Sequence, residues 1–226
     1  MSITGSGQDD NAPVSSAKSI MPPYLVLRDF LDEATVAGLL DYAQAHQSDF
    51  APTKLGSKAV NPSFRVSVGL SNLGKYRQAL KTRILDLVPR LIAELQVMPF
   101  ESPKLETELV AHGDGAFYKR HIDTQTARYY DVRQIRVLSG VYYFHAEPKA
   151  FEGGALRLFA IGADPAPYID IEPVRNSFLV FPSWAPHEVR PVSCLSHKFI
   201  DSRFAINCWI HRPKPAVSDG TVGAAG

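Results

Sequence analysis

The sequence predicts an α+β fold in which helices come first, strands follow, and the helices pack on one face of a sheet. Apolar residues recur at helical spacing between about residues 32 and 97. From Leu105 onward, short β-rich runs alternate with turns that contain Gly, Pro, Asp and Asn. Many short strands of this kind are typical of a sandwich or a barrel.

Composition restricts the chain to the ordinary globular classes. Its 226 residues, 45% of them hydrophobic, suit one domain with tails. A formal net charge of +1 gives no electrostatic case for nucleic acid or an anionic membrane as a partner. Cys194 and Cys208 form no disulfide framework, which indicates a cytoplasmic setting. We find neither a stretch long enough to span a membrane nor the pattern of a secretory signal.

Both ends of the chain are predicted to be flexible tails. Residues 1–20 are rich in Ser, Gly, Asp and Ala, and residues 213–226 have a similar character. The folded unit is then a single domain over residues 21–212. We divide it into a helical buttress over about 21–104 and a strand-rich core over about 105–212.

The buttress is expected to contain two helices and two strands. Tyr24–Leu27 predicts the first strand, and Asp32 is placed to cap the helix that follows. Residues 63–70 alternate between polar and apolar side chains, which predicts a second strand. A long helix is expected over about 75–97, where leucines and Ile form one apolar stripe. Pro89 should kink this helix or divide it in two.

Eight short strands are expected in the second half of the chain, each bounded by turn residues. They cover residues 106–111, 116–121, 135–145, 155–160, 168–171, 177–181, 188–191 and 203–211. Helices followed by a run of strands indicate that the helices cover one sheet.

A candidate metal site begins at the end of the second of these strands. His121 and Asp123 are two residues apart, so both would point to one face of an extended strand. His187, directly after a Pro far downstream, is the best candidate for a third ligand. Two imidazoles and one carboxylate on one face leave other positions open, which suits Fe(II) and oxygen chemistry. The plainer interpretation of the pair alone is a surface His beside a loop Asp.

Five segments strengthen the metal-site interpretation because they occur together and in a familiar order. They are Tyr118–Asp123, Val141–Phe144, Phe151–Phe159, Pro186–Val189 and Arg203–Trp209. Together they resemble the Fe(II)/2-oxoglutarate dioxygenases, most closely the prolyl 4-hydroxylase branch. The resemblance covers about residues 105–212 and implies a double-stranded β-helix, or jelly roll, for that core. It also implies Fe(II) as cofactor, 2-oxoglutarate and O2 as cosubstrates, and ascorbate as a candidate reductant.

The resemblance assigns roles to particular residues. His121, Asp123 and His187 match the iron ligands and are the catalytic candidates. Arg203 matches the residue that binds the distal carboxylate of 2-oxoglutarate, for which a planar guanidinium is suited. Because Arg203 lies further beyond the distal His than is usual, Lys198 competes for that role by spacing. The other candidates for the cosubstrate pocket and its surroundings are Tyr118, Tyr143, Leu156, Asn207 and Trp209.

The implied reaction is hydroxylation of a C–H bond, with a prolyl residue in a protein or peptide as the leading substrate. A free amino acid or other small molecule is the alternative, because substrate choice resides in loops. A zinc hydrolase or a non-catalytic metal-binding module is the third hypothesis. Arg136 and Trp184 are candidate substrate contacts. We expect the loops at residues 51–62 and 125–134 to determine selectivity.

Overall fold

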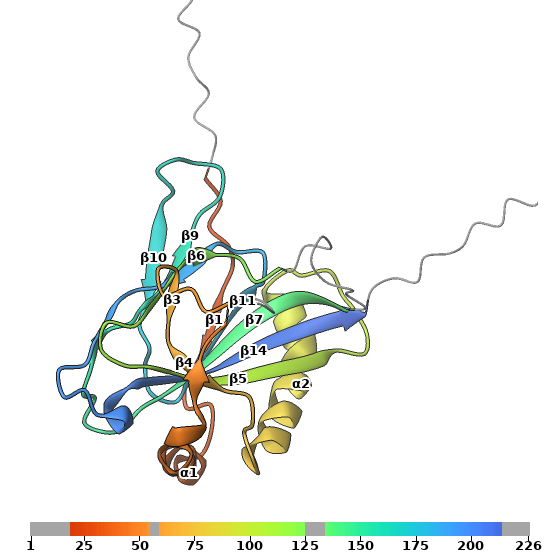
Figure 1. Ribbon diagram of the computed structural model, residues 1–226. Coiled ribbons are helices and arrows are strands. Elements are labelled where there is room, and N and C mark those ends of the chain that lie inside the picture. Colours follow the sequence, from red (N-terminus) through yellow and green to blue (C-terminus); the bar gives the residue numbers. More distant parts are fainter. Residues whose placement is uncertain (1–18, 55–58, 125–133, 214–226) are drawn as a thin grey trace, which may run out of the picture.

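The computed structural model describes residues 19–54, 59–124 and 134–213 of the chain. Nearly all of both predicted tails, residues 125–133 and residues 55–58 therefore lie outside the described residues. Within the described part, two antiparallel sheets face each other and two helices cover the outer face of the larger one (Figure 1). The predicted α+β class and jelly-roll architecture are confirmed.

The two helices begin and end close to where the sequence places them. Helix α1 spans Glu33–Ala45, and the Asp32 side chain accepts a hydrogen bond of 2.9 Å from the backbone N–H of Thr35. Helix α2 spans Tyr76–Glu94 and runs through Pro89 without interruption, so its predicted division is wrong. Pro89 lies on the exposed side, while the buried stripe continues on both sides of it and holds the helix to the sheet. No helix in the described ranges is both long and apolar enough to cross a membrane.

The larger sheet has the strand order β1-β11-β7-β14-β5-β4-β2 and the smaller one the order β10-β9-β12-β6-β3. In the larger sheet these strands span Leu25–Leu27, Ser177–Pro182, Gln134–Phe144, Arg203–Pro213, Lys104–His112, Val68–Leu70 and Ala51–Pro52. In the smaller sheet they span Tyr168–Ile171, Leu156–Phe159, His187–Val189, Phe117–His121 and Arg65–Val66. A short ribbon pairs β8 (Glu152–Gly153) with β13 (Val192–Ser193), and the 3₁₀ turns are η1 (Gln47–Asp49) and η2 (Phe199–Asp201).

Strand β7 explains how the larger sheet separates a structural core from a functional interior. Its even-numbered residues, among them Tyr142 and Phe144, pack in the cluster beneath the helices. Its odd-numbered residues Val141 and Tyr143 pack in a second cluster between the two sheets. Because side chains alternate across a strand, the helical face carries most of the packing and the inner face is left for a site.

The strand predicted over residues 63–70 is divided between the two sheets. Residues 65–66 form β3, which pairs with β6 of the smaller sheet. Residues 68–70 form β4, which pairs with β5 of the larger sheet. Ser67 lies at the crossing, and the polar–apolar alternation continues through it, so the pattern itself does not reveal the change of sheet. The predicted N-terminal tail also needs one correction, since Ile20 exchanges two backbone hydrogen bonds with Ile161.

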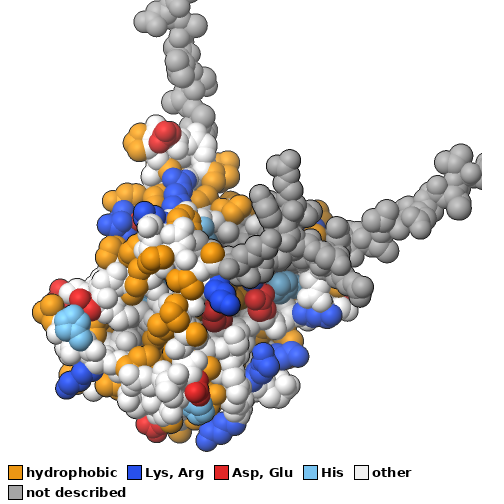
Figure 2. Space-filling model, in the orientation of Figure 1, with side chains coloured by type: hydrophobic (Ala, Val, Ile, Leu, Met, Phe, Trp, Pro, Cys, Tyr) orange, Lys and Arg blue, Asp and Glu red, His pale blue; other side chains and the backbone are white. Residues whose placement is uncertain are grey.

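Charged side chains are mixed over the visible surface. On the face seen in Figure 2, basic and acidic groups are interspersed among hydrophobic and uncharged ones. This distribution agrees with the formal net charge of +1 over the whole chain.

Candidate metal centre

Strand pairing brings two histidines together between the sheets. His121 is the last residue of β6 and His187 is the first residue of β12. The two strands are antiparallel neighbours, and these residues are direct partners in the register. Their ring centroids are 4.2 Å apart. Residues 66 positions apart in sequence thus present two imidazoles to one point.

Asp123 completes the group from just outside the sheet. Strand β6 ends at His121, so the expectation that His121 and Asp123 share a strand is wrong, although the two side chains do converge. The backbone N–H of Asp123 donates to the carbonyl of Ser183, at 2.9 Å, which fixes the chain after the strand. Its two carboxylate oxygens lie 3.6 Å from His121 Nε2 and 3.7 Å from His187 Nε2. All three potential ligand atoms lie within 4.8 Å of one another.

The hydrogen bonds of the two rings leave the right atoms free for a metal. Nδ1 of His121 lies 2.8 Å from the carbonyl of Lys119, and Nδ1 of His187 lies 2.9 Å from the carbonyl of Ala185. Because a carbonyl only accepts, each Nδ1 carries the proton and each Nε2 keeps a lone pair. Burial, followed by the neighbouring His121, lowers the pKa of His187 to about 4, so this ring is neutral at pH 7. The donor set therefore fits a divalent transition metal such as Fe(II).

The third ligand is held ionised and oriented by its neighbours. Burial raises the pKa of Asp123, but its contacts with His121 and His187 and the hydrogen bond from Ser139 outweigh burial and hold the pKa below its usual value. The Ser139 hydroxyl donates to Asp123 at 2.7 Å and lies 3.0 Å from the Ser183 hydroxyl. One carboxylate oxygen is thereby fixed from the larger sheet, across the interior.

Replacing Ser139 with alanine should weaken Fe(II) binding by about 10- to 100-fold, the usual effect of losing a group that orients a ligand. Anaerobic competition against a chelator would measure the affinity. The matched control is Ser177→Ala, since that buried hydroxyl donates to the carbonyl of Val174 away from the centre. An unchanged affinity in Ser139→Ala would show that Asp123 is positioned by the backbone alone.

One cavity is lined both by the three ligands and by Arg203. This side chain is only 1% exposed and lines the same cavity as His121, Asp123 and His187. Its Nε donates to the carbonyl of Gly154 at 2.7 Å, and its guanidinium carbon lies 4.9 Å from the centre of the Tyr143 ring. Burial lowers its pKa, but a guanidinium remains charged at neutral pH. The cavity thus combines a metal-ligating group with a buried cation.

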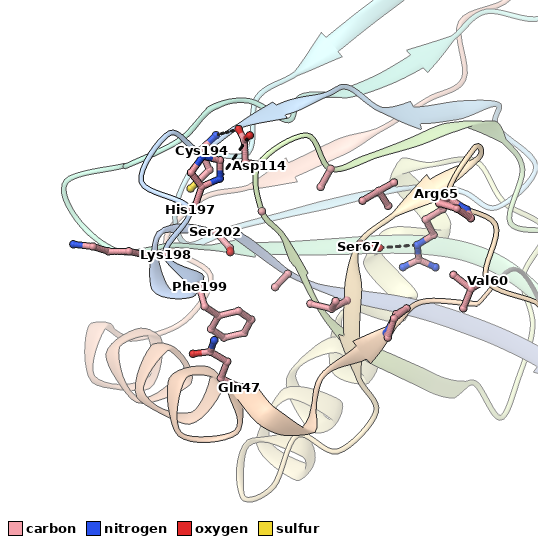
Figure 3. A pocket seen from close by; sticks show the side chains of 17 residues that line it. Gln47, Val60, Arg65, Ser67, Asp114, Cys194, His197, Lys198, Phe199 and Ser202 are labelled. Atoms are coloured by element: carbon pink, nitrogen blue, oxygen red, sulfur yellow. Dashed lines mark hydrogen bonds and ion pairs between the residues drawn. The ribbon is translucent and has the colours of Figure 1, made fainter.

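Lys198 belongs to a different cavity. It borders η2 on the segment between β13 and β14, where a hollow of about 600 Å³ is also lined by Asp114, Cys194 and Ser202 (Figure 3). In Figure 3 its side chain points away from the body of the protein, and the residue is exposed. Of the two sequence candidates for the anchor, Arg203 alone lines the cavity of the metal ligands.

The remaining sequence candidates divide into those that line the cavity and those that do not. Tyr118, Leu156, Asn207 and Trp209 line it, and the Tyr118 ring stacks on His121 with centroids 3.6 Å apart. Among the described residues, Tyr143, Arg136 and Trp184 are not part of the lining.

Each of the three outlying candidates has its own setting. Tyr143 packs beside Arg203 with a buried hydroxyl, and burial raises its pKa to about 12. Arg136 donates to both carboxylate oxygens of Glu106, at 2.9 and 2.8 Å, and stacks on the Trp209 ring. Trp184 is 44% exposed on the turn before His187.

Arg65, His112 and Ser139 are polar residues of the site that the sequence did not indicate. Arg65 and His112 are buried polar residues in β3 and at the end of β5, and Ser139 lies within β7. Arg65 and Ser139 lie within predicted strands and His112 directly follows one. The one available signal was this position, which becomes informative only when strand pairing is known.

Comparison with known proteins gives a consistent result. Residues 107–211 match the model of the 2OG-Fe(II) oxygenase superfamily. An uncharacterised PKHD-type hydroxylase of Synechocystis sp. is 38% identical over 140 residues, which cover 59% of this chain and 45% of that protein. The chain therefore spans less than half the length of this curated relative.

Two solved structures share the fold. A prolyl-4-hydroxylase from Pseudomonas putida matches with a TM-score of 0.62 and 23% identity, over 85% of this chain and 94% of that one. A prolyl hydroxylase from Trichoplax adhaerens, in complex with a hypoxia inducible factor peptide fragment, matches with a TM-score of 0.63 and 22% identity. That match covers 83% of this chain and 82% of the other. At these identities the similarity concerns the fold.

Proposed function

We propose that this chain, which belongs to the 2OG-Fe(II) oxygenase superfamily, is an Fe(II)- and 2-oxoglutarate-dependent dioxygenase that hydroxylates a C–H bond. The observation that carries the proposal is the combination of three free donor atoms within 4.8 Å and a buried Arg203 in one cavity. A zinc hydrolase could use similar ligands, but it would need no buried cation beyond them.

Arg203 supports 2-oxoglutarate as the cosubstrate. A buried guanidinium is unfavourable unless an anion or several acceptors meet it. Here its contacts include the Gly154 carbonyl and the ring of His112, both uncharged, while Nη2 has no partner among the described residues. A carboxylate would supply the missing anion with bidentate geometry. The distal carboxylate of 2-oxoglutarate is well suited, since Arg203 lines the same cavity as the metal ligands that would bind its 2-oxo acid end.

The chain's own residues would hold the reactants and exclude water. Bound Fe(II) would supply the activation of O2 that couples oxidative decarboxylation of 2-oxoglutarate to hydroxylation. His121, Asp123 and His187 would hold the ion, with both imidazoles fixed by backbone carbonyls. Val141, Leu156 and Val189 give the cavity apolar walls. Burial raises the pKa of Tyr118 to about 12, so the ring beside His121 stays neutral at pH 7.

We infer a prolyl residue in a protein or peptide as the substrate. The names of the relatives support this class, since one is a PKHD-type hydroxylase and two similar folds are prolyl hydroxylases. Arg136, the candidate substrate contact beside Trp209, is paired with Glu106. A substrate there would therefore meet an ion pair and not an uncompensated positive charge. A free amino acid or other small molecule is the alternative class.

Anaerobic titration with 2-oxoglutarate tests the proposed cosubstrate. Adding it to the Fe(II)-loaded protein should produce the visible metal-to-ligand charge-transfer band of a chelated 2-oxo acid. A protein that binds Fe(II) without developing this band would contradict the dioxygenase proposal. A screen of prolyl peptides and free amino acids, followed by succinate release and mass change, would then identify the substrate class.

A further inference from the structure

His112 is a buried polar residue of the cavity to which neither metal binding nor the Arg203 anchor has yet given a role. It ends β5 and lies directly opposite Arg203 in the β5–β14 register, so both side chains point into the space between the sheets. The ring is 3% exposed. It is nine residues from His121 and belongs to the other sheet, so it is no part of the metal-ligand group.

The contact with Arg203 determines which ring nitrogen carries the proton. Nδ1 of His112 lies 3.4 Å from an Nη atom of Arg203. A guanidinium nitrogen can only donate, so Nδ1 must be the acceptor. The proton of the neutral ring is then on Nε2, which becomes a buried donor without a partner among the described residues.

The charges nearby keep the ring in this neutral form. Burial, and then the positive charges of Arg203 and Arg65, lower the pKa of His112 well below its usual value. Arg65 is partly compensated by Glu108 at 3.3 Å, but Arg203 has no carboxylate partner among the described residues. A neutral ring can therefore donate at Nε2 without placing a third positive charge in the cavity.

Three buried donors lack partners here in the described part of the chain, two on side chains that line the cavity and one on Tyr143, which packs beside Arg203. Among the described residues, Nε2 of His112, Nη2 of Arg203 and the hydroxyl of Tyr143 make no hydrogen bond. A buried donor left unpaired is destabilising, and one without a partner in the protein calls for a ligand or water. Donors in this number, one of them cationic, suit an anion with several acceptor lone pairs.

We propose that His112 is a cosubstrate-binding residue, donating from Nε2 to the distal carboxylate of 2-oxoglutarate beside Arg203. This inference rests on the proposed function. The pairing of His112 with Arg203 gives the residue two tasks, since Nδ1 orients the guanidinium and Nε2 contacts the anion. The site is thereby specific for a dicarboxylate and not merely for a 2-oxo acid.

Two amide substitutions separate the tasks of the two ring nitrogens. In His112→Asn the amide reaches the position of Nδ1, so the contact with Arg203 is kept and the distant donor is lost. In His112→Gln the amide reaches the position of Nε2, so the donor is kept. We expect 2-oxoglutarate affinity to fall about 10- to 100-fold in His112→Asn and to recover substantially in His112→Gln. The matched control is His145→Gln, because His145 is also a buried histidine but lies outside the cavity.

The affinities can be read without turnover. The charge-transfer band of the Fe(II)-loaded protein under anaerobic conditions reports 2-oxoglutarate binding, and loss of Fe(II) is measured separately. Pyruvate, a 2-oxo acid without the distal carboxylate, is the specificity probe, and its affinity should be the same in wild type and His112→Asn. Nitrogen-15 NMR of the wild-type imidazoles should find His112 as the neutral Nε2–H tautomer between pH 6 and 8.

Each outcome bears on the proposal. Equal affinity for 2-oxoglutarate in wild type and both variants would overturn it, as would an Nδ1–H tautomer in the folded wild type. A parallel loss of pyruvate binding would reduce His112 to a structural residue. If the wild type bound Fe(II) but no 2-oxoglutarate, the proposed function would fail first, and this inference with it.

Discussion

His187→Ala should abolish Fe(II) binding and turnover while leaving the fold intact. The substitution removes one of three potential ligand atoms that lie within 4.8 Å of one another. The two that remain are too few to hold the ion. Loss of a group that only orients a ligand lowers metal affinity by about 10- to 100-fold, so loss of the ligand itself should exceed about 100-fold. His121→Ala and Asp123→Ala should behave in the same way.

Metal binding and folding must be measured separately in these variants. Anaerobic Fe(II) titration gives the affinity, and thermal unfolding of the metal-free proteins tests the fold. His145→Ala is the matched control, because it removes a buried imidazole outside the cavity and should leave Fe(II) affinity unchanged. Near wild-type Fe(II) affinity in His187→Ala would remove the basis of the proposed function.

The metal centre was predictable because its ligands are chemically distinctive and carried by short motifs. His121 and Asp123 identified one another by spacing, and His187 was the best candidate for a third ligand, a role that the resemblance also assigns to it. The structure corrects the explanation of why Asp123 lies beside His121. Its backbone is held by the Ser183 carbonyl after the strand has ended, and the two residues do not share a strand face. Sequence spacing identified the carboxylate. Its orientation, however, depends on a hydrogen bond to Ser183, a residue 60 positions away.

His112 and Arg65 show what sequence alone could not provide. Each is a single polar residue in a strand, and such residues are usually on the solvent face. Their role depends on pairings between distant segments, namely β5 with β14 and β3 with β6. The same dependence explains the error at residues 63–70, since an alternating pattern reveals the face of a residue but not the sheet that contains it.

Arg203→Ala should raise the dissociation constant for 2-oxoglutarate by at least about 100-fold while Fe(II) still binds. Removing one partner of a buried ion pair costs about 3–5 kcal/mol, and each 1.4 kcal/mol is tenfold in affinity. The metal ligands belong to the smaller sheet and its adjoining turn, whereas Arg203 begins β14 of the larger sheet. The effect should therefore be confined to the cosubstrate, and the charge-transfer titration would measure it.

Lys198→Ala is the matched control for Arg203→Ala. Lys198 is exposed and lines the other cavity, so its removal should change 2-oxoglutarate affinity by less than about twofold, in keeping with the small value of exposed charges. The opposite result, a loss of affinity in Lys198→Ala and none in Arg203→Ala, would show that Lys198 binds the distal carboxylate of 2-oxoglutarate. Sequence spacing from His187 would then identify the binding residue better than burial in the cavity does. Arg203→Lys should give an intermediate loss. A lysine keeps the positive charge. It cannot, however, donate to the Gly154 carbonyl and also form two parallel hydrogen bonds to a carboxylate, as a guanidinium can.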